Sequence, residues 1–323
     1  MRIVIALGGN AMTGADGRAH PEEQRAAVRR AAVPIAELVT QGHELMLTHG
    51  NGPQVGNILV KNELAAAVVP PVPLSWCGAQ TQATIGMLLM NALDTELARR
   101  GVQKRTATLV SRTLVAKDDF AFEHRTKPIG RFVGEEEAEL LGEHGERYVE
   151  VPGRGWRRVV ASPEPLECLD AAAADVLLSQ DYLVVCSGGG GIPTVLNDDG
   201  TYEGVEAVID KDLTAAVVAE HLAADVLVIA TDVESVVLDW GTPEARPLGE
   251  VTAQQMRALV AQQGFAAGSM GPKVEAVTRF CERTGGTGII TSLDSVSAAV
   301  VDQAGTRVVP PTQRADRGAD RTA

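Results

Sequence analysis

Aromatic rings and long apolar runs are scarce in this chain. Only 3% of its 323 residues are aromatic, and so low a content argues against a stacking platform for single-stranded nucleic acid. No stretch approaches the roughly 20 apolar residues that span a bilayer. The net charge of −13 argues against a nucleic-acid-binding surface. We therefore predict neither a membrane span nor a nucleic-acid partner.

Cysteine is also rare. The four cysteines, Cys77, Cys168, Cys186 and Cys281, are widely spaced and form no CxxC pair, which predicts small apolar core residues in a reducing compartment. The apolar segment 1–9 is too short for a signal peptide. These features predict a cytoplasmic protein. Its 45% hydrophobic content is typical of a soluble chain with a large core.

Two common phosphate-binding signatures are absent. The chain contains no GxxxxGK[ST] motif, and no GxGxxG follows its first apolar run, so neither a P-loop nor a Rossmann dinucleotide site is expected. Apolar, β-rich runs instead alternate with helical patterns. The clearest runs cover residues 2–7, 44–48, 183–187, 225–229 and 306–309. This alternation predicts a parallel α/β sandwich.

One segment differs in character from the rest. Residues 113–158 are rich in charge and lack a periodic apolar pattern, which predicts a small subdomain projecting from the sheet. Lys127 lies in it, so the subdomain could act as a lid that brings a charge over a substrate; the alternative is a solvated lysine. Residues 241–250 are expected to form a loop. We assign residues 1–311 to a single domain and predict a disordered tail over 312–323.

Glycines follow three of the predicted strands. Backbone N–H groups in such loops can approach a ligand closely, and ligands of open parallel sheets bind outside the carboxyl ends of the strands. Plain tight turns are the alternative, although the run 188–191 has more glycines than a turn requires. The predicted phosphate- and substrate-binding residues are Gly8, Gly9, Asn10, Gly50, Asn51, Gly52, Gly188 and Gly189. His49, beside the second loop, is either a ligand or base, or a packing residue.

Lysine is the scarcer of the two basic residues. The chain has 29 lysines and arginines, of which six are lysine, so arginine supplies the ordinary surface charge. Three of the lysines, Lys127, Lys211 and Lys273, lie in tight polar motifs with Gly, Pro or Asp. A lysine ammonium is a compact point charge that suits a moving phosphoryl oxygen. We therefore expect these three to converge on one phosphate.

The motif 268–273 places Lys273 in the first turn of a helix that Pro272 helps to open. A cation is unfavourable there, which favours an anionic ligand; the alternative is an ordinary junction of loop and helix with a solvated lysine. Asp212 lies beside Lys211 near another helix start and is expected to position the lysines; the alternative is a helix cap with a surface ion pair. Glycine loops with separate lysines, and no nucleophilic Ser or Cys motif, favour phosphoryl transfer by positioning and charge neutralisation.

The motifs taken together resemble the carbamate kinases of the amino-acid kinase superfamily. The resemblance covers residues 2 to 309 and rests on the segments 6–11, 48–56, 127–130, 204–212, 231–233 and 268–273. Many superfamily members carry a lysine shortly before the first glycine pair, where this chain has Ala6 and Leu7. The carbamate kinases also lack it, and in them the charge comes from an Asp-Lys-Asp motif, which here contains Lys211.

The resemblance implies a fold, an activity and an assembly. The fold would be a three-layer α/β/α sandwich on an open, mainly parallel sheet of about eight strands, with a small protruding subdomain. The activity would be reversible phosphoryl transfer between ATP plus carbamate and ADP plus carbamoyl phosphate, making ATP in arginine or purine catabolism. Mg²⁺ would be held mainly by the nucleotide phosphates. The chain would form a homodimer, for which the predicted helix 78–100 offers an apolar face.

The resemblance also implies roles for individual residues. Lys211 and Lys273 would neutralise the transferring phosphoryl group, Asp212 would orient them, and Lys127 would close over carbamoyl phosphate. The glycines and asparagines of the first two loops would hold phosphate and carbamate oxygens. The nucleotide would be held by Thr231, Asp232, Val233, Met270, Gly271 and Pro272.

Three other interpretations remain open at this point. The chain could be an enzyme of the same fold with another acceptor, such as a different carboxylate or a phosphate monoester. It could instead be a non-catalytic nucleotide-binding member of the fold, although the three lysines argue against this. A structural scaffold without a ligand fits poorly with three glycine-rich strand ends.

Overall fold

The computed structural model of the chain describes residues 1–13, 19–143, 145–263, 270–301 and 303–311. The predicted tail 312–323, and the residues 268 and 269 that precede Met270, lie outside the described residues. The main sheet has eight strands in the order β15-β17-β16-β12-β1-β2-β9-β3. Its neighbouring strands are parallel except for the pair β16 and β17. The predicted open, mainly parallel sheet is therefore confirmed.

The central strands of the main sheet are apolar because helices cover both faces of it. Five of the six residues of β1 are fully buried, as expected for a central parallel strand. The strands are β1 (Arg2–Leu7), β2 (Glu44–His49), β3 (Arg105–Thr108), β9 (Tyr182–Val185), β12 (Val226–Thr231), β15 (Glu250–Thr252), β16 (Thr287–Ser292) and β17 (Thr306–Val309). Because β12, β1 and β2 are adjacent and parallel, the loops that follow them open at one edge.

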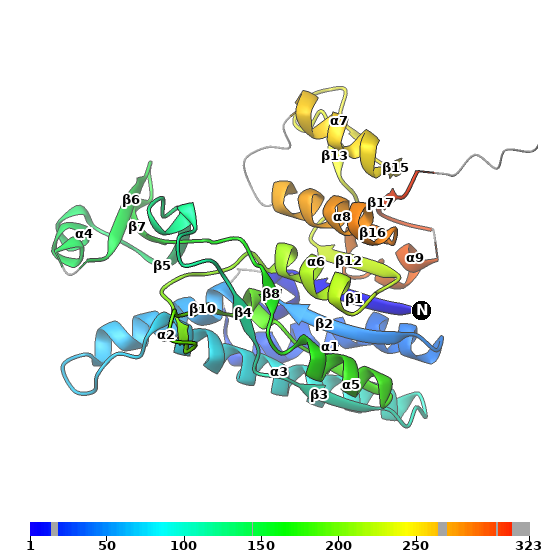
Figure 1. Ribbon diagram of the computed structural model, residues 1–323, viewed down its shortest axis with the longest axis horizontal. Helices are drawn as coiled ribbons and strands as arrows, with labels where there is room; N and C mark the ends of the chain where they lie inside the picture. Colours follow the sequence, from blue (N-terminus) through cyan, green and yellow to red (C-terminus); the bar gives the residue numbers. More distant parts are fainter. Residues whose placement is uncertain (14–18, 144, 264–269, 302, 312–323) are drawn as a thin grey trace, which may run out of the picture.

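Two helical layers complete the sandwich (Figure 1). One cluster of buried side chains joins the sheet to α5 (Ala171–Ser179), α6 (Lys211–His221), α7 (Ala253–Gln263) and α8 (Met270–Thr284). The opposite cluster joins it to α1 (Pro21–Thr40), α3 (Leu74–Arg99) and α9 (Val296–Val300). Alternate residues of β1 enter the two clusters, as the pleat of a strand requires. The predicted three-layer sandwich is confirmed.

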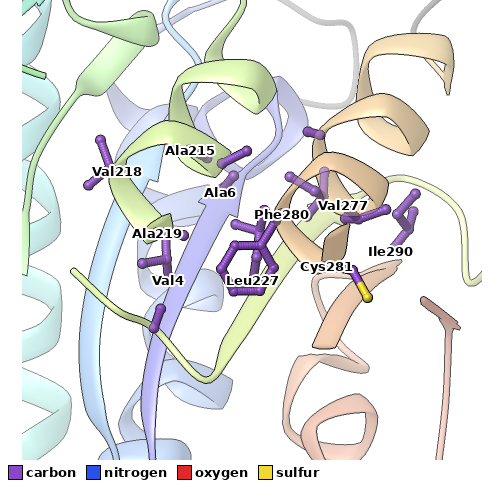
Figure 2. Packing of buried hydrophobic residues seen from close by; sticks show 14 of the residues in the cluster. Val4, Ala6, Ala215, Val218, Ala219, Leu227, Val277, Phe280, Cys281 and Ile290 are labelled. Carbon is purple, nitrogen blue, oxygen red and sulfur yellow. The ribbon is translucent and has the colours of Figure 1, made fainter. Parts of the chain in front are cut away.

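Figure 2 shows the packing that fixes the two helices nearest the central strands. Phe280 of α8 lies against Leu227 of β12, and Ala219 of α6 lies beside Val4 of β1. Phe280 is 1% exposed. Burying a side chain of this size stabilises the fold by about 2 kcal/mol. This packing holds α6 and α8 against the sheet.

A separate sheet projects from the sandwich, at the left of Figure 1. It contains β5 (Lys127–Val133), β6 (Arg147–Val151) and β7 (Gly155–Val160), in the order β5-β7-β6, with α4 (Glu135–Gly142) beside it. We call these elements the lid. Residues 112–114 form β4, which belongs to a four-stranded sheet with β8 (Glu167–Cys168), β10 (Ile192–Leu196) and β11 (Tyr202–Gly204). The helix α2 (Gly52–Ala65) packs against the lid strand β5.

The remaining elements are short. They are the 3₁₀ helices η1 (Gly9–Met12), η2 (Phe120–Phe122) and η3 (Gly188–Gly190), and the strands β13 (Val237–Leu238) and β14 (Arg246–Pro247). The β14 strand and the first residue of β15 fall in the segment 241–250 that was expected to be a loop, so this expectation was wrong in part. All four cysteines are buried and unpaired, as predicted. None of the helices in the described ranges has the length and apolar content needed to cross a bilayer.

Candidate active site

Two of the predicted lysines share one buried carboxylate. Asp212 is the second residue of α6, and its Oδ2 accepts a hydrogen bond from Lys273 Nζ of α8 at 2.9 Å. Lys211 Nζ donates to the other oxygen, Oδ1. The side chains of Lys211, Asp212 and Lys273 are only 14%, 4% and 10% exposed. Lys211 and Lys273, 62 positions apart in the sequence, thus place their ammonium groups on one carboxylate. The net charge of the three side chains is about +1.

Local structure at the start of α6 fixes this cluster. Asp210 is the N-cap residue, and its Oδ1 accepts hydrogen bonds from the backbone N–H groups of Asp212 and Leu213 at 2.9 and 3.4 Å. A side-chain cap of this kind stabilises a helix by about 1 kcal/mol. Burial raises the pKa of Asp212, but Lys211 and Lys273 outweigh this effect, so the pKa lies below its usual value. The carboxylate is therefore ionised at neutral pH.

Lys127 reaches the same helix start from the lid. It is the first residue of β5, and its Nζ lies 3.2 Å from Oδ2 of Asp210, the residue that caps α6. Its side chain is 38% exposed, so this lysine is much more accessible to solvent than the other two. Lys127, Lys211 and Lys273 all line one cavity of about 920 Å³. The three lysines singled out in the sequence thus lie around one space.

The first two glycine loops lie side by side at the carboxyl edge of the sheet. The N–H of Gly8 donates to the carbonyl of Ala230, and that of Gly50 donates to the carbonyl of Leu7. A Cβ on Gly50 would lie 3.5 Å from Gly9 and 3.7 Å from the side chain of Lys211. Because glycine has no side chain, the backbones of these two loops can lie close to each other and to Lys211.

The predicted loop residues divide between two cavities. Gly50, Asn51, Gly52 and Gly189 line the larger one, whereas Gly8 and Gly9 line a second cavity of about 400 Å³. Asn10 follows Gly9 in η1, and its side chain lies outside the described part of the structure. Gly188 lines neither cavity, so the expectation that it contacts a ligand directly finds no support in this geometry.

Gly188 has a packing role instead. A Cβ at this position would lie 2.3 Å from His49 Nε2, so the glycine is required by the buried histidine. His49 is 1% exposed, and burial lowers its pKa to about 4. The imidazole is therefore neutral at neutral pH, and its Nδ1 lies 3.0 Å from the carbonyl oxygen of Gly50. Since His49 lines neither cavity, the packing alternative fits it better than a role as ligand or base.

Two residues of α3 hold the glycine loops and were missed in the sequence. Gln82 Nε2 donates to the carbonyl of Gly188 at 2.9 Å, and its Oε1 accepts from the N–H of Ser111 at 2.8 Å. Thr81 Oγ1 accepts from Asn51 Nδ2 at 2.9 Å. Both side chains are 2% exposed. Polar residues on the otherwise apolar face of this helix were the available signal.

The second cavity contains part of the predicted nucleotide site. Thr231 and Asp232, which end β12, line it, but Pro272 lines the larger cavity, and Val233, Met270 and Gly271 line neither. Other residues on its wall were not predicted: Arg30 of α1 and Ser292, Leu293 and Asp294 at the end of β16. Because β16 runs parallel to β12, the carboxyl end of β16 lies at the same edge. The strand order would therefore have identified Ser292, Leu293 and Asp294, but not Arg30.

The two cavities meet at the lysine cluster. Within the described ranges, Lys211 and Lys273 are the two residues that line both. A group at the ammonium pair can therefore be reached from either side. No three His, Cys, Asp or Glu side chains in the described part of the chain are grouped so that they could hold a metal ion.

Comparison with known proteins defines the class to which this site belongs. The model of the amino acid kinase family matches residues 1–292. N-acetylglutamate synthase from Neisseria gonorrhoeae has the same fold, with a TM-score of 0.53 at 17% identity over 96% of this chain and 61% of that one. The fold is thus shared with distant proteins.

Proteins with higher sequence identity to this chain define a narrower class within the family. The carbamate kinase of Pyrococcus furiosus is 43% identical over 312 residues, which cover 96% of this chain and 99% of that protein. The carbamate kinase of Trichomonas vaginalis is 42% identical over 313 residues, with 96% and 100% covered. The structure of carbamate kinase from Giardia lamblia bound to AMP-PNP has a TM-score of 0.91 at 41% identity, with 96% and 98% covered. The chain belongs to the carbamate kinases of the amino acid kinase family.

Proposed function

We propose that this protein transfers a phosphoryl group reversibly between ATP plus carbamate and ADP plus carbamoyl phosphate. One observation carries the proposal beyond family membership: Lys211 and Lys273 line both cavities. A donor in one cavity and an acceptor in the other would place the transferring group between them, beside the two ammonium groups. Charge on the phosphoryl oxygens would there be neutralised in the transition state, which is the main requirement of this reaction.

The remaining residues have parts in the same scheme. In the forward direction a carbamate oxygen attacks the γ-phosphorus as the bond to the β-phosphate oxygen breaks. That carbamate oxygen carries no proton at neutral pH, so no general base is needed. The N–H group of Gly9 would bind donor phosphates, and those of Gly52 and Gly189 would bind the acceptor. Asp212 would hold both lysines in place, and Lys127 would approach from the lid.

Mg²⁺ fits this site as a companion of the nucleotide. Mg²⁺ is commonly held by substrate phosphates, waters and one or two carboxylates rather than by a protein cage. Asp232 and Asp294 are the carboxylates on the wall of the second cavity, and they could hold the ion through its waters. When bound, the ion supplies positive charge between the phosphate oxygens. Thr231, whose hydroxyl donates to Asp232 at 3.0 Å, would orient that carboxylate.

Assembly, location and direction complete the proposal. We infer a homodimer, as the family resemblance implies, and its test is the mass of the particle in solution against twice that of one chain. A cytoplasmic location is consistent with four buried, unpaired cysteines. Carbamoyl phosphate is a mixed anhydride and a strong phosphoryl donor, which favours net formation of ATP, as in arginine or purine catabolism.

The direct test is ATP formation from ADP and carbamoyl phosphate, with and without Mg²⁺. We expect turnover that requires the ion. A parallel screen would offer ATP with carbamate, acetylglutamate or UMP and measure the ADP released. Strong activity with acetylglutamate or UMP and none with carbamate would replace this proposal with another acceptor. Nucleotide binding with no turnover in either direction would indicate a non-catalytic member.

A further inference from the structure

The lid carries two arginines whose guanidinium groups have no ion-pair or hydrogen-bond partner among the described residues. Arg154 and Arg157 both line the larger cavity, and neither guanidinium makes an ion pair or hydrogen bond with a described residue. Other lid arginines differ: Arg131 pairs with Glu63 at 2.9 Å and Arg158 with Glu146 at 2.8 Å. The chain has 42 acidic residues, yet no described carboxylate pairs with either of these two arginines.

An aromatic ring holds the two guanidinium groups together. Arg154 lies 4.2 Å and Arg157 5.2 Å from the centroid of Phe132. Arg157 is the cross-strand neighbour of Phe132 in the pairing of β7 with β5. Arg154 lies in the turn between β6 and β7, where its N–H donates to the carbonyl of Val151 at 2.9 Å. Cation–π contacts stabilise such stacking, but they provide no hydrogen-bond acceptor for either guanidinium group.

The surroundings of Arg157 point to an anionic ligand. Its Nε is buried and has no hydrogen-bond partner, and a buried donor without an acceptor is destabilising. Burial and the nearby charge of Arg154 lower the pKa of Arg157 from its usual value. Two cations side by side repel each other unless an anion joins them. A phosphate would satisfy both, because arginine presents paired N–H donors that match its oxygens.

The position of Arg154 and Arg157 indicates which of the two substrates they bind. Arg154 and Arg157 line the cavity that contains the second glycine loop and not the one that contains Thr231 and Asp232, so they face the acceptor side rather than the nucleotide side. Arg157 is three residues along β7 from Val160, the cross-strand neighbour of Lys127. At about 3.3 Å per residue, the backbone positions of Arg157 and Val160 lie about 10 Å apart along β7. The arginine pair therefore lies further along the lid than the start of β5, where Lys127 is.

We propose that Arg154 and Arg157 form an outer subsite on the lid that binds the phosphate of carbamoyl phosphate before it reaches Lys211 and Lys273. This inference rests on the proposed function. Arg154 is exposed to solvent, so an incoming dianion can meet the pair first. The net charge of the protein is −13, and local positive charge at the entrance offsets the repulsion that an anionic substrate would otherwise experience.

Steady-state kinetics of Arg154→Gln, Arg157→Gln and the double variant test this subsite. Each single change is expected to raise KM for carbamoyl phosphate about tenfold, the effect of one lost charged hydrogen bond. We expect kcat and KM for ADP to stay within about twofold, because the arginines face neither the transferring group nor the nucleotide. Arg157→Lys, which keeps the charge but not the paired donors, should recover part of the affinity. An unchanged KM for carbamoyl phosphate, or a loss confined to kcat, would overturn the inference.

Arg147→Gln is the matched control. Arg147 lies in the same three-stranded sheet and is exposed, it does not line the cavity, and its side chain contacts only the carbonyl of Glu123 among described residues. It removes the same charge from the lid, so it should leave KM for carbamoyl phosphate within about twofold. An equal rise in KM in this control would overturn the subsite in favour of a general effect of lid charge.

Direct binding separates this inference from the proposed function. Phosphonoacetamide, an unreactive analogue of carbamoyl phosphate, can be titrated calorimetrically into the wild type and the double variant. The inference predicts weaker binding to the double variant by at least tenfold and a steeper loss of affinity with salt for the wild type. Equal affinities would overturn it. If the wild type binds the analogue through the arginines but makes no ATP, the proposed function fails and the anion subsite stands.

Discussion

The cations at the edge of the main sheet and those on the lid are held in different ways. Lys211 and Lys273 are buried, and both donate to Asp212. Arg154 and Arg157 lie against one ring, without a carboxylate. Buried charges need a fixed partner to be tolerated, whereas accessible ones can await a ligand. From this difference we infer two separate roles. The sheet edge provides a preorganised site for phosphoryl transfer, and the lid arginines bind the incoming substrate.

The largest loss should follow removal of either lysine at the sheet edge. We expect Lys211→Ala and Lys273→Ala each to lower kcat on the order of 1,000-fold, as found when a preorganised donor to a developing charge is lost. Lys117→Ala is the control, since Lys117 is 46% exposed and lies outside both cavities. Near-normal turnover in both variants would show that the sheet-edge lysines are not the site of phosphoryl transfer.

Loss of the shared carboxylate should affect stability as well as activity. Asp212→Asn leaves two buried ammonium groups without an anion, and we expect the free energy of unfolding to fall by about 3 kcal/mol. Urea denaturation measures this, with the exposed Asp198→Asn as control. Addition of ADP and Mg²⁺ should restore part of the loss, because bound phosphate supplies the missing charge. Unchanged stability would show that the cluster is not held by Asp212.

Lys127 is intermediate between the sheet-edge lysines and the lid arginines, because it is on the lid but contacts Asp210, the cap of α6. Lys127→Ala should lower kcat/KM for carbamoyl phosphate about 10- to 100-fold, the range expected for one charged hydrogen bond. Its greater exposure predicts an effect on unfolding of less than about 1 kcal/mol. A stability loss equal to that of Asp212→Asn would place Lys127 with the structural cluster.

A last effect, on stability alone, concerns the packing behind the sheet-edge site. The folded pKa of His49 is about 4, below the unfolded value of about 6.5. The unfolded chain therefore binds a proton that folded His49 does not accept, so stability is lost as the pH falls from about 6.5 toward 4. Between pH 7.5 and 5 this contributes about 2 kcal/mol. Urea titrations at both pH values should show a smaller difference for His49→Gln than for the wild type or His124→Gln.

Much of the fold could be predicted because its strands are long, apolar and followed by glycine. The run 2–7 gave β1 without error, and the end of that strand marked the edge where the site lies. The elements that were missed are short and polar: β15 has three residues and β14 has two. Their pairing comes from tertiary contacts with the sheet, which leave no periodic pattern in the sequence.

The candidate site was predictable to a similar degree and for related reasons. The rarity of lysine singled out Lys211 and Lys273, and the resemblance to carbamate kinases was confirmed by comparison. Thr81 and Gln82 were missed because their roles depend on which loop the helix faces. The ligand contact of Gly188 stays a prediction. Arg154 and Arg157 were hidden among other charges of the lid, since only the structure distinguishes a paired arginine from an unpaired one.

The most direct test of the central claim is a structure of the protein with ADP, Mg²⁺, carbamate and aluminium fluoride, which mimics the transferring phosphoryl group. We expect the fluoride ligands between the two cavities, within about 3 Å of the Nζ atoms of both Lys211 and Lys273. Aluminium fluoride bound between ADP and carbamate with neither ammonium group in contact would contradict it.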